Sequence, residues 1–302
     1  MSEQTLPEPA AVEKMLESLN LSLTSEVNWQ LDSMFRKLTG WGAKSNVKRL
    51  AKLARFAEPA LKLCLASGET VLYVSKGVRY SFAEQYFMGA LWANLINQTV
   101  FVLTNARLLM LHTNTKGQPK HTAWMIYYSE IGKFKGSWTG MMDVRLKDGK
   151  KIRFSGFPKQ DRRNMVEVFE AAMERYQEAG FSPETTQSCE NLCGHCFHVV
   201  PKDEYRCGEC AEEFWTPKQL ALRSLVFPSW GDFLMRHYVL AAFELFGYCL
   251  GWMFVIAAFT GDDPAFGVIS LVIFLFFAHG VDAAVTHAVA KKGLNPRRKP
   301  VH

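Results

Sequence analysis

Two apolar runs near the C-terminal end constrain this chain more than any other feature. They extend from Tyr238 to Phe259 and from Ala265 to Val289, and only the five residues TGDDP separate them. Each run exceeds the roughly 20 residues that a helix needs to cross a bilayer. So short a connection allows only a tight turn. The sequence therefore predicts a two-span transmembrane hairpin over residues 237–290.

Basic residues flank both ends of this hairpin and predict its orientation. Lys218, Arg223 and Arg236 precede the first run, residues 291–302 form a basic cytosolic tail, and the turn between the runs is acidic. Because Lys and Arg collect on the cytoplasmic side of a membrane, we expect both termini in the cytoplasm. The polar start of the chain, MSEQTLPEPA, does not resemble a cleaved signal peptide. The soluble part is then expected in a compartment that keeps thiols reduced.

Ionisable residues interrupt both apolar runs. Glu244 lies in the first run, and His279 and Asp282 lie in the second, all at similar depth in an antiparallel hairpin. Such residues are costly in a bilayer and indicate function by default. This intramembrane polar cluster could pair internally, bind a metal or relay a proton, or it could simply hold the helices or a partner subunit together. Gly247 and Gly251 also allow close helix contact, so we expect a protein partner or a homo-oligomer through the hairpin.

Five of the seven cysteines fall between residues 189 and 210, and this clustering predicts a metal site. Two C-x-x-C pairs, ten residues apart, each form a short turn that presents two thiolates. Four thiolates match the tetrahedral coordination of Zn2+. We predict a structural zinc ribbon over residues 187–216, with the ligands Cys193, Cys196, Cys207 and Cys210. Cys189, His195 and His198 are alternative ligands.

The stretch CGHC, residues 193–196, is also found in thiol–disulfide oxidoreductases, so a thiol redox enzyme is a remote alternative. A redox cysteine lies at a helix N-terminus, which lowers its pKa. The residues after Cys196, FHVVPKDE, instead predict a strand and a turn. Nucleic acid is not an expected partner of the ribbon, because phosphate avoids acidic surfaces and the ribbon is rich in them: Asp203, Glu204, Glu209, Glu212 and Glu213.

Upstream of the cysteines, the chain changes from helical to β-rich patterning. Residues 1–67 place apolar residues at steps of three and four, which predicts an N-terminal helical segment. Residues 68–180 contain β-branched and aromatic runs, a hairpin turn at Asp148-Gly149, and a closing helix for which Asp161 is a plausible N-cap. Residues 217–236 predict an amphipathic connector to the hairpin.

The order of these β-rich runs resembles bacterial PH-like and GRAM-like domains. The runs are GETVLYVSKG, VFVLTNARLLML, a strand that ends in YYSEI, VRLKDGKKIRF and the final helix. The resemblance implies a curved β-sheet or barrel with a C-terminal helix, in a membrane-associated or protein-binding module of the bacterial inner membrane. Residues 81–98 depart from it, because they predict either an inserted helix that covers the sheet or a loop that enters lipid.

The expected fold class is therefore α+β, with a PH-like domain, a small zinc ribbon and two transmembrane α-helices. No catalytic motif stands in a suitable context. We expect a non-enzymatic adaptor, scaffold or lipid-sensing module; the alternative is an accessory subunit of a transport or ion-translocating complex that uses Glu244, His279 and Asp282. Membrane lipid is the expected partner of a basic set around the Asp148 turn, which is Arg145, Lys147, Lys150, Lys151 and Arg153.

Overall fold

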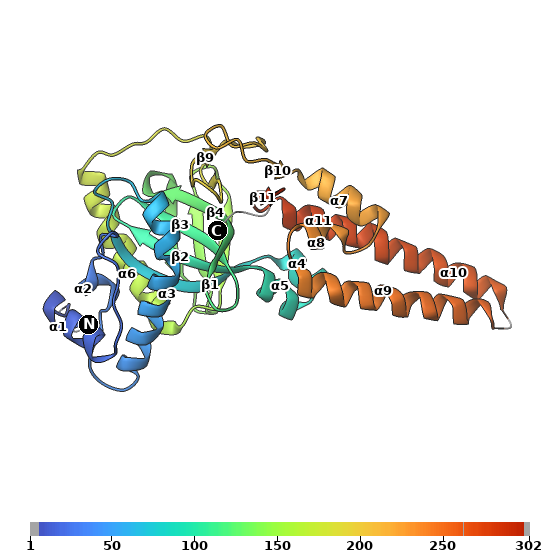
Figure 1. Ribbon diagram of the computed structural model, residues 1–302, viewed down its shortest axis with the longest axis horizontal. Coiled ribbons are helices and arrows are strands. Elements are labelled where there is room, and N and C mark those ends of the chain that lie inside the picture. Colours follow the sequence, from blue (N-terminus) through green and yellow to red (C-terminus); the bar gives the residue numbers. More distant parts are fainter. Residues whose placement is uncertain (1–5, 262, 299–302) are drawn as a thin grey trace. The chain divides into compact units, whose positions relative to one another are not determined.

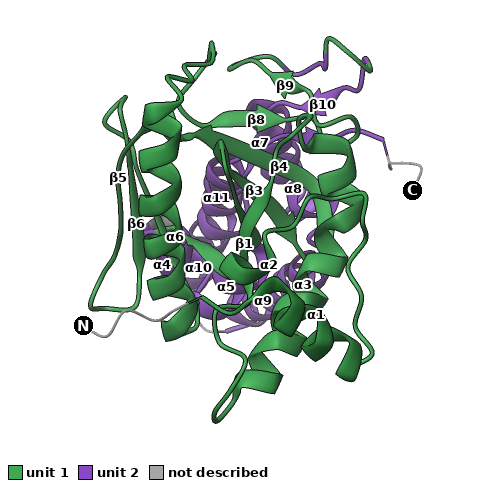
Figure 2. Ribbon diagram, turned by 90° about the vertical axis from the view of Figure 1, so that its left-hand side faces the viewer, with its two compact units in different colours: residues 1–81, 97–204, 208–210 green, residues 82–96, 205–207, 211–302 purple. Residues whose placement is uncertain are grey.

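The computed structural model describes residues 6–261 and 263–298, and two compact units divide the chain. Unit 1 contains residues 1–81, 97–204 and 208–210, and unit 2 contains residues 82–96, 205–207 and 211–302 (Figure 2). Two residues of the expected charge pattern, Asp262 in the acidic turn and Lys299 in the basic tail, lie outside the described residues. The mixed α+β class expected from the sequence is confirmed.

A nine-stranded antiparallel sheet forms the centre of unit 1 (Figure 1). Its strand order is β5-β6-β7-β1-β2-β3-β4-β8-β9. The hairpin turn expected at Asp148-Gly149 is present and joins β6 to β7. The strands are β1 (Val71–Tyr80), β2 (Gln98–Thr104), β3 (Arg107–Thr113), β4 (Pro119–Tyr127), β5 (Ile131–Gly136), β6 (Met142–Leu146), β7 (Lys151–Ser155), β8 (Glu190–Leu192) and β9 (Val199–Val200).

Alternating side chains give this sheet two apolar faces, and each face has its own helical cover. Val100 and Val102 of β2 join one core with α1 (Pro9–Ser18), α2 (Leu31–Met34) and α3 (Ala43–Cys64). Phe101 and Leu103, which the period of two places on the opposite face, join a second core with α6 (Lys159–Glu178). The short helix η1 (Tyr128–Glu130) leads from β4 into β5.

Asp161 is not the N-cap of α6, and the sequence-based expectation is wrong on this point. The helix begins at Lys159, and Asp161 lies in its first turn, fully buried. Its Oδ1 accepts hydrogen bonds from the Arg49 guanidinium at 2.6 Å and the Tyr73 hydroxyl at 3.3 Å, and its Oδ2 accepts one from the Ser75 hydroxyl at 2.5 Å. A buried carboxylate needs such partners. Asp161 therefore ties α6 to α3 and β1.

Unit 2 is built around a helical hairpin. Helix α9 (Tyr238–Phe259) coincides with the first apolar run, and the second run is α10 (Pro264–Leu275), a π-type turn η2 (Phe276–Val281) and α11 (Asp282–Ala290). Both helices are long and apolar enough to cross a membrane. Only 17% and 11% of their most apolar windows are buried, so most of the apolar surface of these two helices is exposed in this chain.

The residues that connect strand β1 to strand β2 belong to unit 2 and not to the sheet. The segment between β1 and β2 forms α4 (Phe82–Phe87) and α5 (Ala90–Ile96). The Trp92 ring of α5 lies 4.8 Å from the Phe243 ring of α9, and Glu84 of α4 pairs with Lys292 at 2.5 Å. Of the two alternatives expected for residues 81–98, the structure has helices and not a loop, and through these two side chains the helices contact the base of the hairpin.

The base of the hairpin is closed by a short clip. Strand β10 (Phe214–Trp215) pairs with β11 (Asn295–Pro296), which follows the second long helix. The Trp215 ring lies beneath two guanidinium groups, with Arg223 at 4.4 Å and Arg297 at 4.9 Å from its centroid. Between clip and hairpin lie α7 (Pro217–Val226), which a Thr216–Gln219 capping box starts, and α8 (Trp230–Leu234).

Candidate functional site

Four cysteines form a compact sulfur cluster, as the paired motifs predicted. The Sγ atoms of Cys193, Cys196, Cys207 and Cys210 all lie within 4.8 Å of one another, and those of Cys193 and Cys210 are 3.6 Å apart. A tetrahedron of sulfurs around Zn2+ at 2.3 Å has edges of about 3.8 Å. The cluster is therefore close enough to bind one metal ion, and its size suits zinc.

The two C-x-x-C pairs adopt the same backbone turn. In the first, the Cys193 N–H donates to the His198 carbonyl and the Phe197 N–H to the Cys193 carbonyl. Cys207 makes the equivalent bonds with Glu212 and Ala211. The residue after each pair has a left-handed backbone conformation, with φ of 55° at Phe197 and 58° at Ala211. The repeated geometry points two thiols per turn to one centre.

The sheet holds the first cysteine turn tightly. Strand β8 pairs with β4, so Leu192 lies opposite Ala123 next to the turn. Gly194 then lies directly against the backbone of β4: a Cβ built on it would come within 1.9 Å of the His121 carbonyl oxygen. Any other residue at position 194 would require the cysteine turn or strand β4 to move. The glycine of CGHC thus allows the turn to dock on the sheet.

The local structure around Cys193 differs from that of a redox motif. The chain after Cys196 continues into β9 and not into a helix, so no helix N-terminus favours a thiolate. Burial instead raises the pKa of the Cys193 thiol above its usual value. Cys189, His195 and His198 are not members of the sulfur cluster. Cys189 packs against the α6 side of the sheet, and burial raises its pKa to about 11.

A row of like charges crosses strands β5, β6 and β7. Lys133, Arg145 and Lys151 stand directly opposite one another in the register, and all three are exposed. Like charges placed opposite each other destabilise a sheet. The adjacent row contains Lys135, Asp143 and Arg153, and Asp143 also bonds Lys151 at 2.9 Å. These residues form what we call the cationic strand surface.

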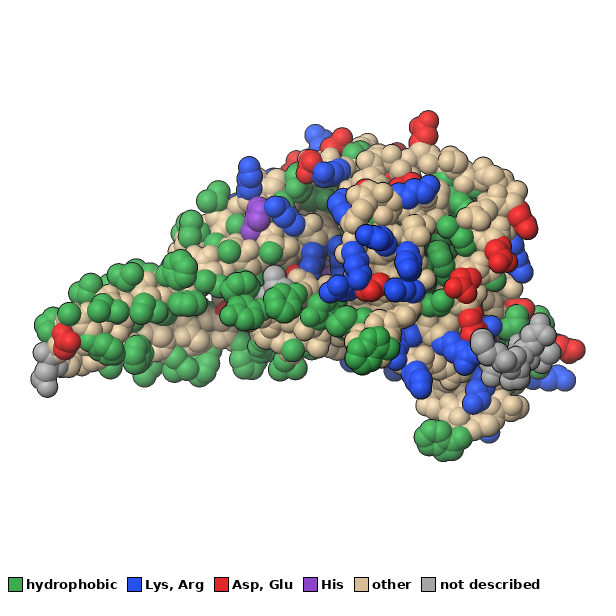
Figure 3. Space-filling model, turned by 180° about the vertical axis from the view of Figure 1, so that it is seen from behind, with side chains coloured by type: hydrophobic (Ala, Val, Ile, Leu, Met, Phe, Trp, Pro, Cys, Tyr) green, Lys and Arg blue, Asp and Glu red, His purple; other side chains and the backbone are tan. Residues whose placement is uncertain are grey.

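The cationic strand surface includes a groove of about 260 Å³. Lysine and arginine side chains gather on the face of the molecule shown in Figure 3. Three of the residues expected to contact lipid, Arg145, Lys151 and Arg153, belong to this surface, while Lys147 and Lys150 lie in the adjoining turn. Sequence reasoning missed Lys133 and Lys135, although their spacing of two in IGKFKG places both on one face of a strand.

The hairpin unit contains a cluster of carboxylates. Oxygens of Glu244, Asp282 and Asp232 lie within 4.8 Å of one another. Asp282 accepts a hydrogen bond from the Ser229 N–H at 2.9 Å, and Asp232 lies 3.0 Å from Nδ1 of His237. Asp232 was not foreseen, because it precedes the apolar runs. Helix α8 places Asp232 beside Glu244 and Asp282, and no local sequence pattern indicates this chain reversal.

His279 faces other partners than Glu244. Its Nδ1 donates to the Leu225 carbonyl at 2.9 Å, and its Nε2 lies 3.5 Å from the Tyr248 hydroxyl. The π-type turn η2 contains His279, and such turns are frequent at functional sites. Of the two glycines in α9, Gly251 packs against the Phe274 ring within the hairpin, and Gly247 has open space around it.

Among known proteins, this chain is similar only weakly to a few solved structures. No family model matches the chain, and no curated protein matches it. The C-terminal domain of an unknown protein from Leishmania infantum is 17% identical, with 40% of this chain and 94% of that chain covered and a TM-score of 0.28. Vav1 bound to an allosteric inhibitor is 14% identical (56% and 50% covered, TM-score 0.30), and autoinhibited Vav1 is 14% identical (56% and 34% covered, TM-score 0.28). The chain thus spans half or less of these Vav1 chains, and the similarity is weak.

Proposed function

We propose that this chain is a non-enzymatic integral membrane protein that holds a PH-like domain at an anionic membrane surface, as an adaptor or lipid-sensing module. The observation that carries the proposal is the row of Lys133, Arg145 and Lys151 on three neighbouring strands. Asp143 pairs with Lys151, but Lys133 and Arg145 stand opposite each other without an acidic partner among the described residues, and such a like-charge pair costs stability. A bound phosphate or carboxylate group would neutralise it, so an anionic headgroup is the natural ligand.

The hairpin supports the membrane part of the proposal. Large apolar side chains of α9 and α10 are widely exposed, among them Phe246 (62%), Met253 (65%) and Val272 (62%). In water such a surface would aggregate, and in a bilayer it needs no other partner. The basic segments on either side of the hairpin favour cytoplasmic termini, and the bacterial inner membrane is the membrane we propose.

The sheet and the cysteines supply the remaining parts. Seven strands followed by the long helix α6, which covers one face of the sheet, support a PH-like domain. Bound Zn2+ would fix the cysteine turns and give this short segment the folding energy that its small core lacks. Because β8 pairs with β4, the ribbon would join the PH-like domain to the segment that leads into α7.

Lysine footprinting tests the proposal on the full-length protein. The protein is placed in nanodiscs of phosphatidylcholine, with or without phosphatidylserine, and acetylation of individual lysines is followed by mass spectrometry. We expect phosphatidylserine to protect Lys133, Lys135 and Lys151, and added salt to reverse the protection. The exposed Lys116 is the internal control. Equal protection of Lys116, or none at the three lysines, would contradict the proposal.

The carboxylate cluster favours a second candidate function, that of an accessory subunit in a transport or ion-translocating complex. Three carboxylates within 4.8 Å repel one another when all are ionised, so such a group takes up a proton or pairs with a cation. On this hypothesis Glu244→Gln or Asp282→Asn abolishes transport by the complex while assembly survives. If the cluster only holds helices together, the same changes weaken assembly or have little effect.

A further inference from the structure

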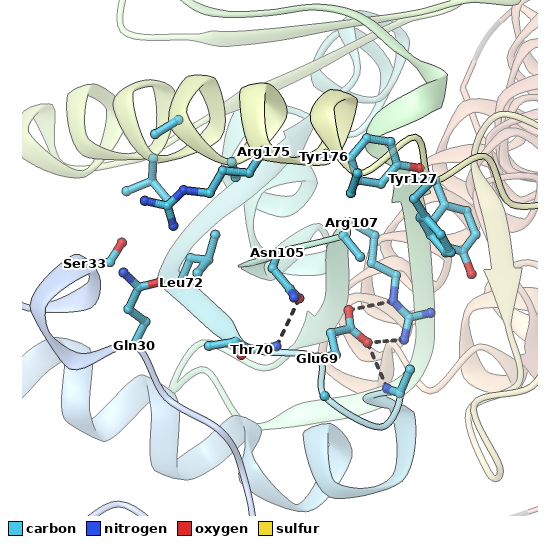
Figure 4. A pocket seen from close by; sticks show the side chains of 18 of the residues that line it. Gln30, Ser33, Glu69, Thr70, Leu72, Asn105, Arg107, Tyr127, Arg175 and Tyr176 are labelled. Atoms are coloured by element: carbon cyan, nitrogen blue, oxygen red, sulfur yellow. Dashed lines mark hydrogen bonds and ion pairs between the residues drawn. The ribbon is translucent and has the colours of Figure 1, made fainter.

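A cavity of about 740 Å³ opens in unit 1, away from the cationic strand surface. Its walls come from the second half of α6, from the first residues of β1, and from the turn between β2 and β3 (Figure 4). Residues Gln30 and Ser33, at α2, close one side. The antiparallel register puts this cavity where β1 begins and β2 ends. Its volume is in the range of small-molecule sites.

Short side chains create the cavity. Leu72 of β1 and Val168 of α6 form an apolar part of the wall, and both residues are almost completely buried. Where longer side chains would fill the space, the chain has mainly alanine and glycine: Ala66, Gly68, Ala106, Ala171, Ala172 and Ala179. Two of these alanines, Ala171 and Ala172, lie on α6, where leucine or methionine would be almost as compatible with the helix. Helix formation therefore does not explain the open space.

The charges in the cavity wall do not cancel. Arg107 forms two hydrogen bonds with the Glu69 carboxylate, at 2.9 and 2.7 Å, and Arg36 pairs with Glu167 at 2.7 Å. The fifth charged residue of the wall, Arg175, is exposed and has no acidic partner in the part of the chain that the structure describes. Its guanidinium reaches over the cavity near Leu72 (Figure 4). One positive charge is thus left for a ligand.

The cavity wall also contains a buried hydroxyl group, that of Tyr176, without a hydrogen-bond partner among the described residues. Tyr176 lines the cavity one residue beyond Arg175, and only 5% of the residue is exposed. A buried polar group without a partner is costly and marks a place where a ligand or water belongs.

We propose that this cavity binds a small amphiphilic carboxylic acid. The planar guanidinium of Arg175 matches a carboxylate, which it can hold by two parallel hydrogen bonds. A single unpaired cation suits a monoanion better than a phosphate dianion. The apolar body would lie against Leu72, Val168 and the alanines of α6. The site is separate from the cationic strand surface and does not depend on the proposed headgroup binding.

Photolabelling tests this proposal. Full-length protein in phosphatidylcholine nanodiscs is irradiated with a decanoic acid that carries a diazirine on its chain, and the labelled peptides are mapped by mass spectrometry. We expect labelling of residues 66–72, 105–107 and 168–181, competed by decanoate and not by decanol. Arg175→Gln should reduce this labelling roughly tenfold or more, because a charge-assisted hydrogen bond is lost. Lys159→Gln, which removes the same charge from the exposed start of α6, should leave it unchanged.

Ala171→Phe provides a second variant that fills the cavity from an exposed helix position, so folding should be preserved. It should abolish labelling at the cavity while labelling of residues 238–290 by lipid-dissolved probe persists. Labelling confined to residues 238–290 would overturn the proposal. So would competition by decanol equal to that by decanoate, or cavity labelling that neither variant changes.

Discussion

Arg145→Gln should make the protein more stable and at the same time weaken its binding to anionic membranes. Arg145 is the middle residue of the cation row, and it stands opposite Lys133 on one side and Lys151 on the other. Each like-charge pair costs on the order of 0.2–1 kcal/mol. Removing the middle charge relieves both pairs, so we expect a gain of roughly 0.4–2 kcal/mol in the free energy of unfolding.

The corresponding rise in melting temperature is roughly 1–8 °C, at 2–4 °C per kcal/mol for a unit of this size class. Binding should change in the opposite sense. One basic residue near an anionic surface contributes about 1 kcal/mol, so its loss weakens membrane association about fivefold. Both effects should shrink as salt is added, because the side chains are exposed.

Two measurements on the full-length protein in phosphatidylcholine nanodiscs check this prediction. Thermal unfolding is monitored through protease cleavage within residues 97–180. Membrane binding is measured by co-flotation with phosphatidylserine vesicles. Lys116→Gln, an exposed lysine outside the row, is the control and should change neither quantity. A lower melting temperature for Arg145→Gln, or unchanged flotation, would refute the reasoning that the row is kept for an anionic ligand at the expense of stability.

Three further changes test other parts of the structure. The purified protein should contain one zinc per chain, with thiols protected until a chelator is added, and Cys193→Ser should lose the metal; a metal-free chain with a reversible disulfide would contradict this. Gly194→Ala should cost about 1–3 kcal/mol and speed zinc loss to a chelator, because the new Cβ meets the His121 carbonyl; unchanged zinc retention would show that the turn does not need this close approach. Glu69→Gln should lower the unfolding free energy by about 3–5 kcal/mol, since it leaves Arg107 buried without its counter-charge; a change below 1 kcal/mol in a urea titration would refute it.

The features that could be predicted from sequence are those with a short local period. The apolar run from Tyr238 to Phe259 coincides with α9, and the spacing of the cysteines foretold their convergence, because each pair needs only its own turn. Charged residues were harder to place. Asp161 has the composition signal of an N-cap, yet it turns inward, because Arg49, Tyr73 and Ser75 offer it buried partners from distant elements.

Long-range pairing explains the other differences. The register that sets Lys133 beside Arg145 depends on how β5 and β6 are aligned, which no window of sequence contains. Asp232 joins Glu244 only because α8 reverses the chain before α9 begins. The cavity beneath Arg175 results from alanines in three separate segments, and each of them taken alone is an ordinary residue of a helix or a turn.

The α4–α5 segment has a consequence for how the protein is made. Trp92 leaves the ribosome about 150 residues before Phe243, the ring on which it packs. At 5–20 residues per second the interval is roughly 8–30 s. Strands β1 and β2 can pair during that time, but Trp92 has no Phe243 ring and Glu84 has no Lys292 to pack on until the second half of the chain is made. The α4–α5 segment therefore reaches its final packing only after translation of the hairpin, although the strands on either side of it are made much earlier.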